Sequence, residues 1–241
     1  MMHTVLFTKK PAQACEPLIA YIDLETNSLD VLSGKILEIG ALVDGSRDVF
    51  STVVHPGHGA ACDDLSVHGI PQEELLSGPG FAEAFARLDQ FLRNASLSVL
   101  ESDDDDSEDG RVQAVTMKPD LQVVLVAHNG TTFDFPFLLS ECLRSRIGPA
   151  VMSSWIYVDT LDVLRATDGS GECKKLQCSL RACGGPRTLQ AHRALDDCFA
   201  LEAVVRHVSE TLGIKPWALL RPFAFRLDEA PSTAQMSALI A

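Results

Sequence analysis

The feature that most constrains this chain is an apolar run that ends in two acidic residues, Leu18-Ile19-Ala20-Tyr21-Ile22-Asp23-Leu24-Glu25-Thr26. Its β-branched and aromatic residues predict a buried strand. In a strand, residues i and i+2 project from the same face, so Asp23 and Glu25 point one way and Leu24 points the other. Two neighbouring buried carboxylates repel each other and are costly to desolvate unless they share a cation. The run therefore predicts a metal site at a strand end, with an ordinary solvated strand end as the alternative.

The bulk composition favours one intracellular domain. The 241 residues are 46% hydrophobic, which is enough for a sizeable core. No apolar run reaches the roughly 18 residues that a membrane span needs. The first 16 residues contain no apolar core of signal-peptide length. We therefore expect a cytoplasmic or nuclear protein with no membrane partner, and the sequence leaves an organelle open.

The charge is strongly negative but unevenly distributed. The net charge is −13, and seven of the acidic residues lie between positions 101 and 109. Without that run, 26 acidic residues face 20 basic ones, a difference of −6. Because a broad grip on duplex DNA needs many Lys and Arg contacts to phosphates, this balance argues against one. It still allows a polyanionic substrate to be held at a local, metal-containing site.

The cysteines suggest neither a disulfide framework nor a zinc site. The chain has seven, with no Cys-x-x-Cys pair, and Cys173, Cys178 and Cys183 recur every fifth residue. That spacing matches neither pattern, so we interpret them as reduced thiols acting as small hydrophobic residues.

The order of elements predicts an α/β fold with a mixed sheet flanked by helices. Three runs joined by short turns predict an antiparallel meander of strands at 18–26, 36–43 and 48–54. The second half alternates strands with helices, which implies parallel crossovers. The expected elements after the meander are a short helix after 66–71, helices at 81–93, 134–146, 160–166, 176–183 and 193–211, and strands at 121–127 and 155–158. The strand at 121–127 is apolar on both faces, so we place it in the sheet centre.

The domain limits follow from composition. We expect a flexible leader at 1–16, one domain at 17–222 and a tail at 223–241. An acidic loop insertion at 94–120 interrupts the domain, with a small hairpin of 97–100 and 112–117 as an alternative reading.

Three further residues complete a candidate site. Asp134 opens a helix and lies over its core-facing stripe, although an N-cap role would also suit it. Asp197 shares a helix face with Leu201 and Val204, where a charged residue needs a partner or a metal. His192 precedes Asp197 by five residues, so it must lie before the helix to serve the same site.

Taken together, the blocks Asp23-x-Glu25, His128-Asn129-Gly130-x-x-x-Asp134 and His192-x-x-x-x-Asp197 resemble the DnaQ-like (DEDDh) 3′–5′ exonucleases of the ribonuclease-H-like fold. The run from Leu125 to Pro136 is most similar to the three-prime repair exonuclease (TREX) group. The segments 158–161 and 215–220 are similar to that group too. The chain departs from some members in its acidic insert and in lacking a proline-rich stretch and a membrane tail.

This resemblance implies a mechanism and a set of contacts. Asp23, Glu25, Asp134 and Asp197 would hold two Mg²⁺ or Mn²⁺, and His192 would take the proton from the attacking water. The product would be a nucleoside 5′-monophosphate, released from a nucleic acid 3′ end, with DNA favoured over RNA and single-stranded or frayed ends expected. The resemblance is also compatible with a homodimer. The implied contacts to the terminal nucleotide come from Leu24, Thr26, His68, Ile70, Asn129 and Phe133, although Ile70 could equally be core.

Three alternatives stay open at this point. One is an RNA-directed enzyme of the same chemistry, because nothing in the sequence reads the 2′-hydroxyl. The second is a polymerase-associated proofreading or accessory subunit. The third is a metal-binding structural module, which would not need His192.

Overall fold

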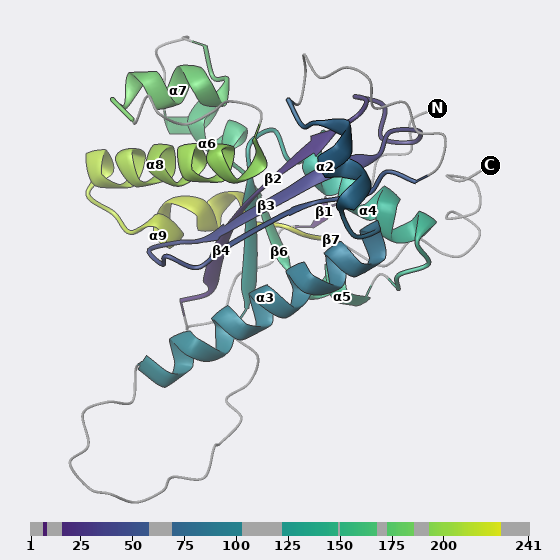
Figure 1. Ribbon diagram of the computed structural model, residues 1–241. Coiled ribbons are helices and arrows are strands. Elements are labelled where there is room, and N and C mark those ends of the chain that lie inside the picture. The colour runs from purple at the N-terminus through teal and green to yellow at the C-terminus, as the bar shows by residue number, and fades with distance from the viewer. Residues whose placement is uncertain are drawn as a thin grey trace, which may run out of the picture.

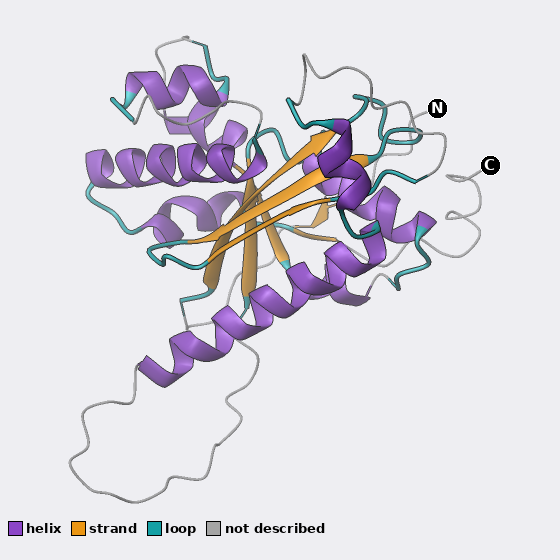
Figure 2. Ribbon diagram, in the orientation of Figure 1, coloured by secondary structure: helices purple, strands orange, loops and turns teal. Residues whose placement is uncertain are grey.

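A computed structural model describes residues 7–8, 16–57, 69–102, 122–148, 150–167, 173–185 and 193–227. Its centre is a five-stranded sheet with helices on both faces, in the strand order β4-β3-β2-β5-β6 (Figures 1 and 2). The strands are β2 (Leu18–Thr26), β3 (Ile36–Val43), β4 (Val49–Val53), β5 (Val123–Ala127) and β6 (Ile156–Asp159). A separate pair joins β1 (Phe7–Thr8) to β7 (Arg226–Leu227). This is the mixed α/β sheet that the sequence predicts.

The helices divide between the two faces of the sheet. They are α2 (Gln72–Ser77), α3 (Phe81–Ser102), α4 (Asp134–Arg144), α5 (Ala150–Ser154), α6 (Thr160–Thr167), α7 (Leu176–Ala182), α8 (Ala194–Leu212), α9 (Pro216–Leu220) and the 3₁₀ turn η1 (Arg221–Phe223). Phenylalanine and leucine side chains of α3 and α4 pack with Ile22 and Leu24 on one face. On the other face, Leu201 and Val205 of α8 pack with Tyr21. No helix in the described ranges is both long and apolar enough to cross a membrane.

β2 is the central strand because it joins the two kinds of pairing. It runs antiparallel to β3 and parallel to β5, and β5 runs parallel to β6. The carboxyl ends of β2, β5 and β6 therefore meet at one edge of the sheet, where α/β folds place their sites. Odd-numbered residues of β2 face α8, so Asp23 and Glu25 project toward that helix while Leu24 enters the opposite core.

The helix α8 lies unusually close to β3 at Gly40. A Cβ atom at this position would lie 2.5 Å from the carbonyl carbon of Ala194 and 2.6 Å from the nitrogen of Leu195. The register places Gly40 opposite Asp23 on the neighbouring strand. The missing side chain thus lets the first turn of α8 approach the acidic end of β2.

Several expectations from the sequence are wrong in detail. β5 is an interior strand, but the sheet centre is β2. Helix α3 continues through Asn94 to Ser102, so residues 97–100 are helical and not half of a hairpin. Burial stabilises the extension, because Ala95 and Ser96 are still covered by the rest of the fold. The Ser96 hydroxyl also donates to the carbonyl of Leu92. The core of the expected acidic loop and its second hairpin strand lie outside the described residues.

We predict that Gly40→Ala destabilises the fold, because the added methyl group must push the backbone of α8 away from β3. Overpacking of this kind costs about 1–3 kcal/mol of unfolding free energy. Urea unfolding of the variant measures the loss.

Gly148→Ala is the matched control, because no atom of the described residues lies within 4 Å of a Cβ placed there. It should change the unfolding free energy by less than about 0.5 kcal/mol. Equal effects from the two variants would refute the close approach at Gly40.

Candidate active site

Three carboxylates converge at the carboxyl end of β2. Asp23 and Glu25 come from that strand and Asp197 comes from the first turn of α8. Each offers an oxygen, and these oxygens all lie within 4.8 Å of one another. The sequence predicted that these acids, from two separate segments, share one site. The close approach of α8 to β3 at Gly40 places Asp197 near Asp23 and Glu25.

Asp134 is the fourth acid, and its side chain is buried. It occupies the first residue of α4, with Phe133 in the N-cap position and no side-chain cap, so Asp134 is not the N-cap. Its carboxylate accepts a hydrogen bond from the backbone of Leu24 on β2. The other oxygen, Oδ1, is buried and has no hydrogen-bond partner among the described residues. A buried oxygen without a donor destabilises the folded state, and a positively charged ligand would stabilise it.

The four acids are electrostatically unfavourable without such a ligand. Burial raises the pKa of Asp23 well above its usual value, and the charges of Asp134, Asp197 and Glu25 add to the shift. Burial and the charge of Asp197 raise the pKa of Glu25 to about 8. Burial likewise raises the pKa of Asp134 to about 8, with Asp159 and Asp197 adding to it. Clusters of this kind are typical of metal sites, where the cation stabilises the ionised form.

This donor set fits a hard divalent cation. Carboxylate oxygens are the ligands that Mg²⁺ and Mn²⁺ prefer. Asp23, Glu25 and Asp197 share one small volume, and the unpartnered oxygen of Asp134 approaches from the neighbouring helix. Among the described residues, the acidic cluster is therefore compatible with metal binding.

Glu38 anchors the helix that carries Asp197. This β3 residue lies opposite Glu25 and is only 1% exposed. One of its oxygens accepts from the backbone N–H of Ala194 at 3.1 Å, which caps α8. Its other oxygen lies 2.9 Å from Nη2 of Arg193, which also contacts Glu74 of α2 at 3.3 Å. Arg193 is thus engaged with two carboxylates.

Asp159 plays the same part for the turn that leads to Asp134. This buried residue at the end of β6 accepts from the backbone N–H groups of Asn129, Thr131 and Leu161 at 2.8, 3.0 and 2.9 Å. The Thr131 hydroxyl adds a fourth bond at 2.6 Å. Asn129 takes a left-handed conformation with φ of 62°. The sequence indicates residues 158–161 only through the family resemblance and does not single out Asp159. An acidic residue at the end of a buried strand is the signal that could have identified it.

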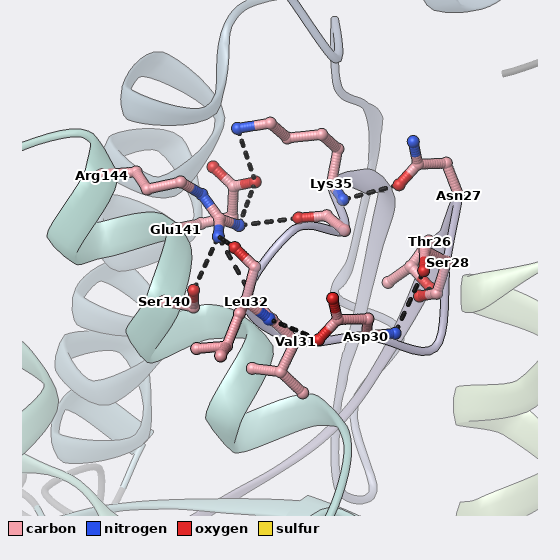
Figure 3. Close-up of polar contacts among 11 residues, drawn as sticks. Thr26, Asn27, Ser28, Asp30, Val31, Leu32, Lys35, Ser140, Glu141 and Arg144 are labelled. Atoms are coloured by element: carbon pink, nitrogen blue, oxygen red, sulfur yellow. Dashed lines mark hydrogen bonds and ion pairs between the residues drawn. The ribbon is translucent and has the colours of Figure 1, made fainter. Parts of the chain in front are cut away.

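Helix α4 also fastens the turn after Glu25 and Thr26 (Figure 3). The guanidinium of Arg144 donates to the carbonyls of Leu32 and Gly34 at 2.9 and 2.8 Å and to Glu141 at 2.7 Å. Within the turn, the Thr26 hydroxyl donates to the carbonyl of Ser28 at 2.8 Å. The backbone next to the acidic cluster is therefore held from outside the strand.

The remaining predicted contact residues have different surroundings. Leu24 is in the core and Thr26 is buried, while Asn129 is exposed and Phe133 is half-buried with its ring 4.8 Å from that of Phe137. Ile70 is fully buried with Leu37 and Leu75, as its core interpretation requires. His68 and His192 lie outside the described residues.

Comparison with known proteins finds an exonuclease family model and an exonuclease relative. A family model described as Exonuclease (RNase_T) matches residues 20–104, which include Asp23 and Glu25. The chain is 31% identical over 199 residues to Exonuclease DPD1, chloroplastic/mitochondrial, of Arabidopsis thaliana. That match covers 80% of this chain and 56% of the relative, so the chain spans little more than half the relative's length. The chain carries an exonuclease-family domain.

Solved structures show the fold of this exonuclease domain. The nuclease domain of 3′hExo, a DEDDh family member bound to rAMP, has a TM-score of 0.59 at 15% identity, over 90% of this chain and 99% of that one. Exonuclease I has a TM-score of 0.62 at 17% identity, over 81% and 41%. Exonuclease X in complex with 5′ overhanging duplex DNA has a TM-score of 0.51 at 18% identity, over 92% and 99%. The fold is the ribonuclease-H-like one.

The raised pKa values of the exonuclease domain predict an inverse dependence of stability on pH. Glu25 and Asp134 have a pKa of about 8 when folded, against about 4.3 and 3.9 when unfolded. The folded state therefore binds more protons, and this contribution is full below about pH 4 and is lost as pH rises through about 8. In a chelator, we expect the unfolding temperature to fall between pH 5 and pH 8.

Two comparisons isolate this effect. Asp134→Asn should flatten the fall, since a neutral amide replaces one titrating group. Mn²⁺ should raise the unfolding temperature much more at pH 8 than at pH 5. A chelated protein that becomes more stable over this interval, relative to the variant, would contradict the assignment.

We also predict that Asp159→Asn loosens the turn before Asp134. The amide places an NH₂ group where backbone N–H groups now donate, and hydrogen bonds to a charged group contribute about 1.5–3 kcal/mol. Urea unfolding should show a loss of that size. Asp162→Asn, an exposed position three residues later, should cost less than about 0.5 kcal/mol. Equal losses would mean that Asp159 does not hold the turn.

Proposed function

We propose that this chain is a two-metal-ion 3′–5′ exonuclease that releases nucleoside 5′-monophosphates from nucleic acid 3′ ends. The observation that carries the proposal is the convergence of four acids from β2, α4 and α8, one of which has a buried oxygen with no donor among the described residues. The exonuclease-family match and the DEDDh fold neighbour support the same chemistry.

The protein's own groups have separate roles in this proposal. Asp23, Glu25, Asp134 and Asp197 would hold two Mg²⁺ or Mn²⁺. Two such ions, when bound, stabilise the attacking and leaving oxygens of an in-line displacement. His192, two residues before the start of α8, would accept the proton of the attacking water. Leu24, Thr26, Asn129 and Phe133 would contact the terminal nucleotide, while the burial of Ile70 favours its core role.

The DNA preference rests on the resemblance of residues 125–136 to the three-prime repair group. A specific observation keeps RNA as the second candidate, because the structural neighbour 3′hExo is bound to rAMP. Another neighbour is described as a 3′-exonuclease that recognises the 3′ end of a histone mRNA stem-loop. The low basic content favours recognition of a frayed or single-stranded end over a grip on long duplex.

The proposal includes the expected domain organisation. A leader at 1–16 precedes the domain at 17–222, which contains the acidic insertion at 94–120, and a tail follows at 223–241. The Arabidopsis relative is named for chloroplast and mitochondrion, so an organelle joins cytoplasm and nucleus as a candidate compartment. Fluorescent fusions of the chain would distinguish these compartments. Light scattering of the purified chain would test the homodimer that the resemblance allows.

Purified protein with Mg²⁺ should shorten a 5′-labelled single strand from its 3′ end and release mononucleotides that carry a 5′-phosphate. Asp23→Asn should abolish this activity with the fold intact. His192→Ala should slow it by about 10²–10⁴-fold, as expected for loss of a general base. Denaturing gels of matched DNA and RNA oligonucleotides give the rates and the sugar preference.

Asp162→Asn and His207→Ala are the matched controls, because both positions are exposed and neither belongs to the acidic cluster. Each should retain the parent rate. Undiminished digestion by Asp23→Asn or His192→Ala would reject the roles given to them. Activity that appears only when a polymerase co-purifies would favour an accessory subunit.

A further inference from the structure

The segment between α6 and α8 holds a pair of cysteines whose thiols contact each other. The thiol of Cys178, in the first turn of α7, hydrogen-bonds to the sulfur of Cys173, which lies just before that helix. Cys173 is exposed and Cys178 is half-buried, so an oxidant in solution can reach the pair. The third cysteine of the regular spacing is different, because Cys183 donates its thiol hydrogen to the carbonyl of Leu180.

The surroundings of this pair favour a thiolate. Arg181 Nη2 lies 3.5 Å from Cys178 Sγ. The bond from Cys178 lowers the pKa of Cys173, and the backbone N–H of Lys175 and the nearby charges of Lys175 and Arg181 lower it further. A thiolate is the form of cysteine that reacts with oxidants and disulfides.

The same segment contacts the acidic cluster through a residue that lies between the two cysteines. The side-chain amide of Gln177 donates to Asp197 Oδ1 at 2.8 Å. A second contact reaches the turn before Asp134, since the ring of His128 hydrogen-bonds to the backbone carbonyl of Lys174. The segment Cys173–Cys178 therefore touches both α8 and the β5–α4 turn.

We propose that Cys173 and Cys178 form a reversible disulfide and that its formation displaces Gln177 from Asp197, which weakens the cation site. The coupling to the cation site rests on the proposed function, whereas the disulfide itself does not. The mechanical reason is that an S–S bond is about 2.05 Å long, shorter than any hydrogen bond between two sulfurs. Closing that gap draws Cys173 and the first turn of α7, which carries Gln177, closer together.

The chemistry balances with hydrogen peroxide as the oxidant. The Cys173 thiolate attacks one peroxide oxygen and breaks the O–O bond, which yields a sulfenic acid and hydroxide; the hydroxide takes up the thiol proton as water. The Cys178 sulfur then attacks the Cys173 sulfur, an S–S bond replaces the S–O bond, and the hydroxyl leaves with the Cys178 proton as a second water. Two thiols and one peroxide give one disulfide and two waters, and dithiothreitol reverses the reaction.

Peptide mapping tests the disulfide directly. Trypsin cleaves after Lys174, Lys175 and Arg181, so Cys173 and Cys178 fall in separate peptides, 166–174 and 176–181, and Cys183 falls in 182–187. The intact protein, treated with peroxide and alkylated, should yield peptides 166–174 and 176–181 linked to each other, with a mass lower by two hydrogens. Cys183 should stay alkylated. Absence of the linked pair, or equal oxidation of Cys183, would overturn the disulfide.

Calorimetric Mn²⁺ titration tests the coupling without an activity assay. The oxidised protein should bind Mn²⁺ about tenfold more weakly than the reduced protein, as is common when a residue supporting a metal ligand is lost. Cys183→Ser should keep this difference, and Cys173→Ser should lose it. Gln177→Ala should bind weakly in both redox states while still forming the disulfide.

The outcomes separate the two proposals. A disulfide that forms with no change in Mn²⁺ affinity would overturn the coupling. Reduced protein that binds Mn²⁺ but digests neither DNA nor RNA would reject the proposed function and leave the disulfide result standing.

Discussion

Mutual repulsion among four neighbouring carboxylates is the constraint on which the rest of the structure depends. The four acids, Asp23, Glu25, Asp134 and Asp197, do not stabilise one another. The charge of Asp197 raises the pKa of the other three, and the charges of Asp134 and Glu25 add to the rise at Asp23. Two arrive on one strand by simple alternation, so their separation is fixed by the backbone. The other two arrive on helices, which could retreat from the strand. The fold must therefore hold those helices in place by other contacts.

Those contacts have a common form: a buried carboxylate or a missing side chain fixes a helix start. Glu38 caps α8 and pairs with Arg193, and Gly40 removes the obstacle to the same helix. Asp159 gathers the backbone N–H groups of the turn before α4. Every carboxylate oxygen of Glu38 and Asp159 accepts a hydrogen bond, whereas Oδ1 of Asp134 in the cluster has no donor among the described residues. Fully hydrogen-bonded acids near the site thus hold the acids of the cluster in place, which is how an unfavourable electrostatic arrangement persists in a folded protein.

The sequence predicts the parts of this arrangement that depend on local pattern. The strand bounds of β2 and β3, the separate faces of Asp23 and Leu24, and the place of Asp197 on α8 follow from periodicity alone. The extension of α3 beyond Arg93 does not follow from it. The polar residues after Arg93 are typical of a loop, and burial of Ala95 and Ser96 against the rest of the fold stabilises the helix there. Glu38 also looks like an ordinary strand residue until Arg193, 155 positions away, is placed beside it. The long-range partner of a single residue cannot be inferred from one sequence.

The two classes of acid also divide the roles of stability and chemistry in this domain. Acids whose oxygens all accept hydrogen bonds, such as Asp159, contribute to stability without a ligand. Asp134 has a buried oxygen with no donor among the described residues, so its ionised form costs stability, which a proton or a bound cation restores. Gln177 connects the cluster to α7, because its amide donates to Asp197 while Leu180 of the same helix packs with Val204 of α8. A movement of α7 would therefore change the hydrogen bonding of a cluster residue directly.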